Sequence, residues 1–569
     1  MTQQAKKSCL IFDEVRVSAE RGRIAARAVR WPGLRRMLFW IALCPSLLAW
    51  HGCLALLMPG SQRQRRAGCP AAIQSNIAGS LRTVIATTVP LFLAITLIGS
   101  TGDVRAQQNL PNMGEPADTT LSPAQELQLG QQFMRQVRAS LPLSQDVELT
   151  EYTTSLGQRI VNAAARSQGQ PRQPFEFFLV NSKIINAFAI PGGFIGLNVG
   201  LVQAMDTEAQ LAGVVAHEIS HITQRHHARA FASDGRNRMT AAVAILAAII
   251  IGQANPQAGQ AALAAGIAAT QQNLINFTRQ NEYEADRSGI ELLSRANFPP
   301  QAMAEAFDIL RRRNRVNSSG SQLEYLRTHP LDNNRIAEAR SRAANLAARA
   351  KPVSPDQQAS LQYELFKARL RVLSQSDDAR LLQQLKAEHK QQPAAGIRYA
   401  ISLVQLRQRN LSAAAKWLAP LVEAHPGQVN LQMQAARIAY ARGAVDISEQ
   451  ILRPLISLYP ESYAAVEELS NQLATERQLS DAYAVLSDYL RSASSINPRA
   501  WRALANVNQK LGYTAASHEA MARYYRLLHE PQRAEQQLRL ALQAADAGSQ
   551  DQLRLEAQIR ELQQQLSKR

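Results

Sequence analysis

The clearest alternation of hydrophobic and polar positions lies between residues 207 and 227. Leu211, Val214 and Val215 recur at helical spacing behind Thr207–Gln210. Thr followed three residues later by Gln forms a capping box, in which each side chain binds a backbone N–H group at the start of a helix. We therefore predict a helix that begins at this box and includes Ala216–His221.

Shorter stretches predict the elements that precede this helix. Ser122 and Pro123 suit the N-cap and the first turn of a helix. Phe175–Val180 is typical of a strand, as is a second run that ends at Pro191. Proline lacks the N–H group that a sheet ladder needs, so a strand that ends in proline suits a sheet edge. We predict that this edge either accepts an extended substrate or is one arm of a plain hairpin. The strand consists of Ala187, Phe188, Ala189 and Ile190.

From about residue 355 the pattern changes to one helix after another, rich in Ala, Leu, Gln and Arg. Prolines recur at intervals of 33 and 34 residues, and turn-like positions recur at intervals of 33 to 35 residues. This is the period of tetratricopeptide repeats, whose helix pairs stack into a curved surface that binds peptides or partners. We predict an all-α tetratricopeptide-like repeat domain over residues 355–545 and a polar helical tail over residues 546–569. The repeating positions are Pro393, Pro426, Pro460 and the turns at Asn410, Gly443, Arg477 and Gly512.

The beginning of the chain contains two apolar runs that follow arginine residues. Met37–Met58 is about long enough to span a bilayer, which takes roughly 20 residues. Val84–Ile98 is shorter, follows Arg82 and leads to the small-residue pattern Val104–Ala106. A short apolar run with such a cleavage pattern is typical of a secretory signal peptide.

These runs set the expected start of the mature chain. We predict a leader over residues 1–106 with a signal peptide at 82–106, followed by a flexible lead-in at 107–121. Residues 1–75 are then either a membrane anchor or an upstream start that is not used, and we favour the unused start. All four cysteines lie in the leader, so the mature chain would have no disulfide and no cysteine-based catalyst or metal site.

Charge follows the same division of the chain. The formal net charge is +18, but the leader holds 14 Lys and Arg against 4 Asp and Glu, which leaves 49 against 41 for the remaining residues. The mature part is thus only mildly basic. It contains no cluster of Lys and Arg with interleaved aromatic residues, so we expect no nucleic-acid partner. A peripheral contact with an anionic membrane surface stays open.

His217, Glu218 and His221 form an HExxH pattern within the predicted helix. Residues four apart lie on one helix face, one turn apart, so both imidazoles can point at one ion. Glu218 projects from nearly the same edge and can reach a water molecule beside the ion, as a hydrolytic zinc site requires. We interpret the pattern as a zinc site rather than as two ordinary histidines on a solvated helix.

Two residues compete for the place of the third metal ligand. His227 lies ten residues after His217, but Gln224 stands where the HExxHxxGxxH pattern has a helix-ending glycine. If the helix continues past Gln224, His227 turns roughly 80° away from the ligand face. Glu282 opens an ExxAD pattern, and we expect a second helix to start there with Asp286 on the same face. Glu282 could bind the ion while Asp286 orients a ligand histidine, and we favour Glu282.

Four motifs, in this order, carry a family resemblance. They are Asn186–Gly193, the HExxH pattern, the ExxAD pattern and Thr328–Pro330. Together they resemble the gluzincin metallopeptidases of the HtpX and CAAX-prenyl-protease type. The resemblance implies an α+β zincin-like metalloprotease domain over residues 122–350 with one Zn²⁺ per chain. It also implies that the edge strand lies along the active-site cleft. His329 could then cover the open zinc position, and Arg335 could help to stabilise charge.

The function that we predict is that of a periplasmic zinc endopeptidase with an attached repeat domain. In this hypothesis His217, His221 and Glu282 hold the zinc and Glu218 is the base. The resemblance implies unfolded or misfolded outer-membrane β-barrel proteins as clients, and the outer-membrane assembly machinery as a partner of the repeats. The alternative is a chaperone or adaptor that binds through its repeats and rarely cleaves.

Two further apolar stretches follow the metal helix. Met239–Ile251 is almost wholly apolar, and Ala261–Ala269 is rich in small residues. Neither reaches the roughly 20 residues of a membrane-spanning helix. We expect a buried helical hairpin, with contact to lipid or to a client as the alternative.

Overall fold

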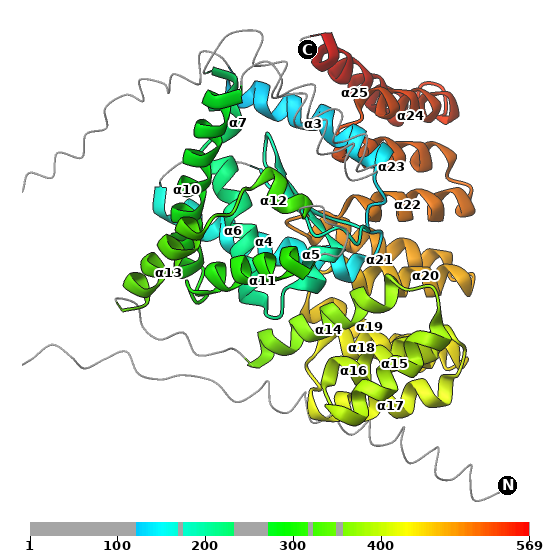
Figure 1. Ribbon diagram of the computed structural model, residues 1–569. Coiled ribbons are helices and arrows are strands. Elements are labelled where there is room, and N and C mark those ends of the chain that lie inside the picture. Colours follow the sequence, from blue (N-terminus) through cyan, green and yellow to red (C-terminus); the bar gives the residue numbers. More distant parts are fainter. Residues whose placement is uncertain (1–120, 169–173, 233–270, 317–322, 349–356, 568–569) are drawn as a thin grey trace, which may run out of the picture. The chain divides into compact units, whose positions relative to one another are not determined.

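The computed structural model describes residues 121–168, 174–232, 271–316, 323–348 and 357–567. The predicted leader, the lead-in up to residue 120 and the apolar stretches Met239–Ile251 and Ala261–Ala269 lie outside the described residues. Within the described part, no helix is long and apolar enough to cross a membrane. We refer to the described residues 121–348 as the sheet-containing part and to residues 357–567 as the repeat part (Figure 1).

The sheet formed by the described residues has three strands, β1 (Glu176–Val180), β2 (Ala187–Ile190) and β3 (Phe194–Asn198). β3 is central, parallel to β1 and antiparallel to β2. β2 is therefore an edge strand, as the proline after it predicted, and it forms a hairpin with β3, a strand that we did not predict. Gly192 and Gly193 join them with φ of 82° and 95°, in the left-handed region that glycine adopts at low cost.

Helices pack around this sheet, and α6 (Glu208–Thr223) contacts β2, α4, α10 and α11. Its predicted capping box is present, because the Thr207 hydroxyl accepts from the Gln210 N–H group and the Gln210 side chain accepts from Thr207. The other helices of this part are α3 (Pro123–Ser140), α4 (Val147–Gln168), α5 (Val199–Ala204), α7 (His226–Ala232), α10 (Gln271–Arg295), α11 (Ala302–Val316), α12 (Glu324–Thr328) and α13 (Asn333–Ala347).

Two glycines let neighbouring helices approach α6 closely. A Cβ atom on Gly289 of α10 would lie 3.2 Å from the backbone nitrogen of His217. A Cβ atom on Gly213 of α6 would lie 2.9 Å from the Cα atom of Met303 on α11. Larger residues at these positions would push the helices apart, so the glycines fix the distance between α6 and its neighbours.

The second predicted helix exists but starts earlier than predicted. We expected it to begin at Glu282, whereas the described residues of α10 span Gln271–Arg295. The expected start was wrong because no helix-ending residue precedes Glu282: residues 271–281 contain neither glycine nor proline, and the helix runs through them. The spacing is unaffected, so Glu282 and Asp286 still lie one turn apart on one face.

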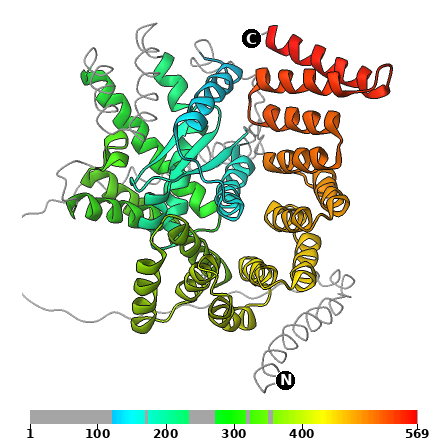
Figure 2. The ribbon, with the colours of Figure 1, turned by 90° about the vertical axis from the view of Figure 1, so that its right-hand side faces the viewer.

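The repeat part consists of helices that pack in consecutive pairs (Figures 1 and 2). The predicted turns join paired helices, and Gly443, Arg477 and Gly512 adopt φ of 81°, 62° and 83° there. At the first turn the left-handed residue is Arg409, and Asn410 is the N-cap of the next helix. The predicted fold class, an α+β zincin-like part followed by an all-α repeat part, is confirmed. The helices are α14 (Gln357–Leu373), α15 (Asp378–Gln391), α16 (Ala395–Arg407), α17 (Leu411–Ala424), α18 (Val429–Ala441), α19 (Val445–Leu458), α20 (Tyr463–Thr475), α21 (Leu479–Ser492), α22 (Pro498–Leu511), α23 (Thr514–Leu527), α24 (Pro531–Ala544) and α25 (Gln550–Ser567).

α14 is shared between the hydrophobic cores of the two parts. Tyr363 and Phe366 belong to the core that surrounds α6. Leu365 and Val372 belong to the core of the first repeat helices. Burial of apolar surface on both sides of one helix fixes the start of the repeats to the sheet-containing part.

A buried ionic cluster also links α4 to the repeat helices. Glu148 accepts hydrogen bonds from Arg437 at 2.6 Å and from Asn430 at 2.8 Å, and it lies 3.2 Å from Arg369. Burial alone would raise the pKa of Glu148, but the two arginines hold it at about 2. Glu148 is thus a carboxylate that fixes α4 to both α14 and α18.

Candidate metal centre

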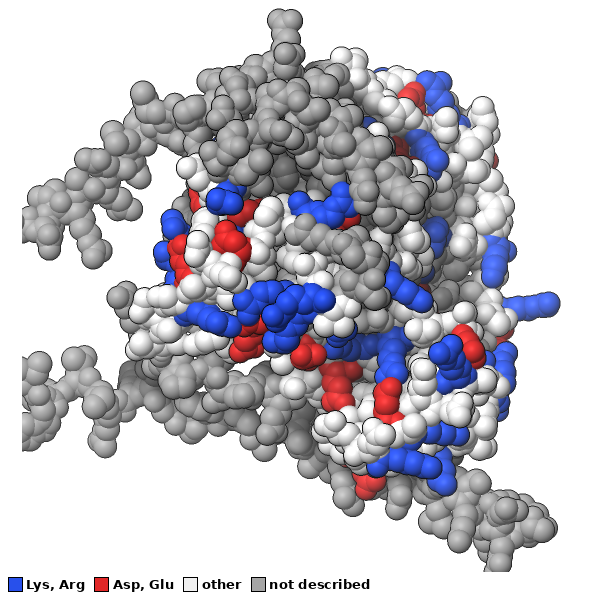
Figure 3. All heavy atoms as spheres, in the orientation of Figure 1, with Lys and Arg blue, Asp and Glu red and all other residues white. Residues whose placement is uncertain are grey.

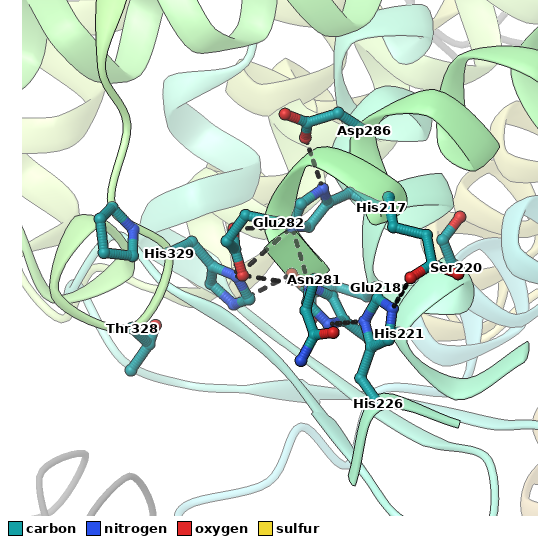
Figure 4. A network of polar contacts seen from close by, with 12 residues as sticks. His217, Glu218, Ser220, His221, His226, Asn281, Glu282, Asp286, Thr328 and His329 are labelled. Carbon is teal, nitrogen blue, oxygen red and sulfur yellow. Dashed lines mark hydrogen bonds and ion pairs between the residues drawn. The ribbon is translucent and has the colours of Figure 1, made fainter. Parts of the chain in front are cut away.

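α6 places His217 and His221 one turn apart with their rings directed at the same point (Figure 4). Their Nε2 atoms lie 3.0 Å apart. Both rings are buried, so bulk water does not solvate these nitrogens. The local helix geometry alone brings the two nitrogens together, because residues four apart share a face.

Residues from two other places in the chain converge on the same point. The carboxylate oxygens of Glu282 on α10 lie 3.4 Å from Nε2 of His217 and 3.4 Å from Nε2 of His221. His329 follows α12, and its Nδ1 atom lies 3.0 Å from Glu282 and 3.3 Å from Nε2 of His217. One ligand atom from each of these four buried residues lies within 4.8 Å of the others. We call His217, His221, Glu282 and His329 the metal group.

Asp286 and Arg335 contact members of the metal group and fix their orientation. Asp286 faces the outer nitrogen of His217, with 3.0 Å between Oδ1 and Nδ1. Arg335 on α13 donates to Asp286 at 2.7 Å and lies 2.9 Å from Glu282. It also donates to the carbonyl oxygen of Pro330 at 2.6 Å. The guanidinium group is therefore engaged with protein oxygens, and it fixes the two carboxylates relative to each other.

The electrostatics of the metal group favour a bound cation. Burial would raise the pKa of Glu282, but His329 and Arg335 hold it well below its usual range. Burial opposes protonation of His217, yet Asp286 and Glu282 raise its pKa to about 10. A proton on His217 adds a positive charge that offsets the carboxylates of Asp286 and Glu282. A bound cation would supply the same positive charge. Two imidazole nitrogens and a carboxylate are also a donor set that zinc accepts.

Glu218, next to His217 on α6, is fully buried. Neither of its carboxylate oxygens has a hydrogen-bond partner among the described residues. Its contact with the metal group is made to His329, whose Nε2 atom lies 3.6 Å from Oε1. An isolated buried carboxylate costs stability, so its presence here calls for a functional reason.

The turn after α6 bears on the choice of the third ligand. α6 ends at Thr223 although no glycine follows, because Arg225 adopts a left-handed φ of 52°. The Arg225 guanidinium donates to Glu126 at 3.0 Å and to the carbonyl oxygen of Leu121 at 2.7 Å. These bonds to α3 and its N-terminal flank offset the backbone strain of a non-glycine residue in this conformation.

Ending the helix does not bring His227 to the metal group. Within the described residues, the metal group contains Glu282 and does not contain His227. The turn brings His226 to the site instead, with its Nδ1 atom 2.8 Å from Nδ1 of His221. We did not predict a role for His226, because it lies outside both histidine patterns. Its position beside His227 was the only signal.

The predicted edge strand lies beside this helix. β2 packs against α6, and all four of its residues are buried. Among the described residues, the β2 backbone pairs with β3 on one side only. The structure therefore places an unpaired strand edge next to the helix that carries His217, Glu218 and His221.

Comparisons with known proteins agree with this geometry. Residues 153–343 match Peptidase family M48. The beta-barrel assembly-enhancing protease of Escherichia coli (strain K12) is 35% identical over 483 residues, which cover 84% of this chain and 96% of that protein. Its counterpart in Yersinia pestis is 35% identical over 477 residues, which cover 81% of this chain and 93% of that protein.

More distant similarities cover less of the relative or are weaker. The mitochondrial metalloendopeptidase OMA1 of Schizosaccharomyces pombe is 29% identical over 184 residues, which cover 32% of this chain and 51% of that protein. The crystal structure of the yeast Tom70 aligns with 65% of this chain at a TM-score of 0.26 and 11% identity, a likeness too weak to bear on the fold.

The family match and the site geometry fall on the same residues. The region matched to the peptidase family contains Glu218 and every member of the metal group. The similarity to the bacterial proteases extends beyond this region and covers nearly the whole length of those proteins. The chain therefore belongs to peptidase family M48 and is a metallopeptidase related to the beta-barrel assembly-enhancing proteases.

Proposed function

We propose that this metallopeptidase is an endopeptidase that binds one Zn²⁺ through His217, His221 and Glu282. The observation that carries the proposal is the convergence of their ligand atoms, together with His329, within 4.8 Å. Catalytic zinc sites in proteins use three such ligands and keep a fourth position open. The buried carboxylate of Glu218 adjoins His217 in the chain, and neither of its oxygens has a hydrogen-bond partner among the described residues.

The residues around the zinc would act as follows on a peptide bond. Zinc, when bound, polarises the peptide carbonyl and makes a water molecule more acidic. Glu218 takes a proton from the attacking water as the water oxygen bonds to the carbonyl carbon. Glu218 then gives this proton to the amine nitrogen as the C–N bond breaks. Asp286 keeps His217 in its ligating orientation throughout.

We assign Arg335 a different role from the one suggested by the family resemblance. We expected it to stabilise charge in the reaction. Its contacts with Asp286 and Glu282 instead support a positioning role, because the guanidinium donors are engaged with these carboxylates and with Pro330. In our proposal Arg335 keeps both carboxylates ionised and aimed at His217.

We propose that β2 binds the substrate as an added strand. Its edge, unpaired among the described residues, can form main-chain hydrogen bonds with an extended peptide, which gives affinity without strict sequence preference. Side-chain selectivity would then come from the surroundings of Ala187–Ile190. This mode suits unfolded chains, because the strands inside a folded sheet or barrel already use their backbone N–H and C=O groups for pairing.

The clients that we propose are unfolded or misfolded outer-membrane β-barrel proteins, and the compartment that we propose is the periplasm. The support is the name of the relatives that match 84% of this chain. The repeats supply a stacked surface for the client or for the outer-membrane assembly machinery. Peripheral contact with a membrane surface is part of this proposal. We propose no nucleic-acid partner, since the sequence has no cluster of Lys and Arg with interleaved aromatic residues. On the described part of the face that Figure 3 shows, basic and acidic side chains are interspersed.

The start of the mature chain tests the proposed compartment. We expect it to begin near Gln107, because the Val104–Ala106 pattern suits signal cleavage. The measurement is the intact mass of chain recovered from the periplasm of a Gram-negative host that expresses the full sequence. A recovered species that retains Met37–Met58 would show that the leader is a membrane anchor.

His329 is expected to restrain the enzyme. Its Nδ1 atom lies among the proposed ligand atoms, 3.0 Å from Glu282, and a neutral imidazole is a good zinc ligand. With His329 in the fourth position, the attacking water has no place at the zinc. We expect His329→Ala to raise basal cleavage of an unfolded protein several-fold, whereas Thr328→Ala, at the adjacent residue, leaves it unchanged.

The sign of the effect separates this role from its competitor. A fall in cleavage in His329→Ala would mean that His329 donates a hydrogen bond to the reacting oxygen, as positioned side chains do in other hydrolases. Equal cleavage in His329→Ala and Thr328→Ala would mean that His329 has neither role.

A second candidate function is that of a chaperone or adaptor with little proteolysis. It is favoured by the burial of the whole metal group, which keeps the site closed in this conformation. Binding and degradation of one unfolded β-barrel protein by the unaltered chain and by Glu218→Gln distinguish the two functions. Binding by both with degradation by neither would support the adaptor.

A further inference from the structure

His221 has a partner on each side of its ring. Its Nε2 atom faces the metal group, and its Nδ1 atom lies 2.8 Å from Nδ1 of His226 (Figure 4). The two rings are nearly perpendicular, at 79°, with their centroids 4.8 Å apart. His226 is only 4% exposed, so this contact is shielded from water. Among the described residues, His226 thus relates to His221 as Asp286 relates to His217.

The other nitrogen of His226 faces a carboxylate. Its Nε2 atom lies 3.4 Å from Oε2 of Glu284, and Arg229 donates to the same oxygen at 2.6 Å. Glu284 belongs to the ExxAD pattern but points away from the metal group. α10 therefore carries Glu282, which belongs to the metal group, and Glu284, which faces His226.

One arrangement of protons satisfies these contacts when His221 binds a cation. Its Nε2 atom must present a lone pair, so the proton of the neutral ring lies on Nδ1. That proton is donated to Nδ1 of His226, which must accept it. The proton of neutral His226 then lies on Nε2 and faces Glu284. The first position follows from the hydrogen bond between the two Nδ1 atoms, and the second from the Glu284 carboxylate, which faces Nε2 at 3.4 Å without a hydrogen bond.

The turn at Arg225 makes this contact geometrically feasible. A helix that continued past Gln224 would carry His226 away from His221, because residues five apart do not share a helix face. The left-handed φ of Arg225 turns the chain so that His226 reaches back. The bonds from Arg225 to Glu126 and Leu121 stabilise this turn.

We propose that His226 is a positioning residue that fixes the tautomer and the ring orientation of His221, with Glu284 as the anchor of His226. The proposal rests on zinc binding at the proposed site. It assigns each ligand histidine its own partner: Asp286 for His217 and His226 for His221. It also gives a function to the strained turn after α6.

The test is zinc affinity, measured by competition with a chromogenic chelator on the purified chain. His226→Leu removes the acceptor, and we expect zinc affinity to fall by about 10- to 100-fold, as is typical when the partner of a ligand histidine is lost. His226→Asn returns an acceptor near the position of Nδ1 and should recover most of this loss. His227→Leu is the matched control and should bind zinc as the unaltered chain does.

A second readout reports the ligand geometry itself. The visible absorption bands of the Co²⁺-loaded chain should shift in His226→Leu and stay unchanged in His227→Leu. Glu284→Gln serves if His226→Leu does not fold, because the Glu284 side chain is 38% exposed and its loss is tolerable. We expect a smaller, few-fold weakening of zinc binding in this variant.

The outcomes separate this role from the zinc site on which it rests. Zinc affinity in His226→Leu equal to that of His227→Leu would overturn the role of His226, as would a loss in His226→Asn as large as that in His226→Leu. Unchanged zinc affinity in Glu284→Gln would remove Glu284 as the anchor. A chain that binds zinc in no form would instead overturn the proposed metal site.

Discussion

Replacing Glu218 with Gln should abolish peptide hydrolysis and leave the fold and the bound zinc in place. Gln has nearly the same shape but cannot take a proton from water, and general-base catalysis contributes about 10²- to 10⁴-fold to a rate. Neither Glu218 oxygen has a hydrogen-bond partner among the described residues, so the substitution breaks no such contact. The measurement is the rate of degradation of an unfolded β-barrel protein, alongside the zinc content of the same preparation.

Ser220→Ala is the matched control for this experiment. Ser220 lies on α6 near Glu218 and is buried, and among the described residues its hydroxyl donates to the carbonyl oxygen of Ala216, one turn earlier in the same helix. Its loss should therefore leave cleavage unchanged. Residual degradation by Glu218→Gln at the rate of Ser220→Ala would remove Glu218 from the catalytic role and direct attention to another base.

The residues that share a helix face could be predicted from the sequence. His217 and His221 are four apart, as are Glu282 and Asp286, and helix geometry alone aligns each pair. The capping box before α6 also follows from local chemistry, because its two side chains bind backbone groups within one turn. These predictions succeed because every interaction they invoke lies within a few residues of the chain.

Spacing along the sequence could not predict that the pair on α6 lies against the pair on α10. α10 reaches α6 because Gly289 has no side chain at the backbone of His217, and a glycine in a helix is by itself no sign of such a contact. Arg335 lies far from Glu282 in the sequence and binds it only in the folded chain. The family resemblance, rather than periodicity, placed Arg335 near the metal, and it did not indicate which atoms the guanidinium contacts.

The end of α6 also depends on a long-range contact that local sequence does not predict. Glycine is the residue expected where a helix ends in a left-handed backbone conformation, and a sequence with Gln224 in its place is typical of a helix that continues. Arg225 adopts that conformation because Glu126 and Leu121, about one hundred positions earlier in the chain, bind its guanidinium. A long-range contact thus overrides a local preference, and it brings His226 rather than His227 to the site.

The choice of third ligand leads to the second large expected effect. Glu282→Ala should bind far less zinc than His227→Ala, because Glu282 lies 3.4 Å from the Nε2 atoms of both His217 and His221. We expect its zinc affinity to fall by more than the about 10- to 100-fold that a lost outer partner costs. Metal content per chain, measured on both purified variants after dialysis against a weak chelator, gives the ranking.

We expect Glu282→Ala to fold, so the comparison measures zinc binding rather than loss of the fold. Arg335 keeps two hydrogen bonds to Asp286, at 2.7 and 2.8 Å, and thus is not left as an unpaired buried charge. Glu282→Gln adds a variant of equal shape that lacks the charge and should retain an intermediate zinc affinity. The opposite ranking, with zinc lost in His227→Ala and kept in Glu282→Ala, would mean that the turn after α6 rearranges on metal binding and makes His227 the third ligand.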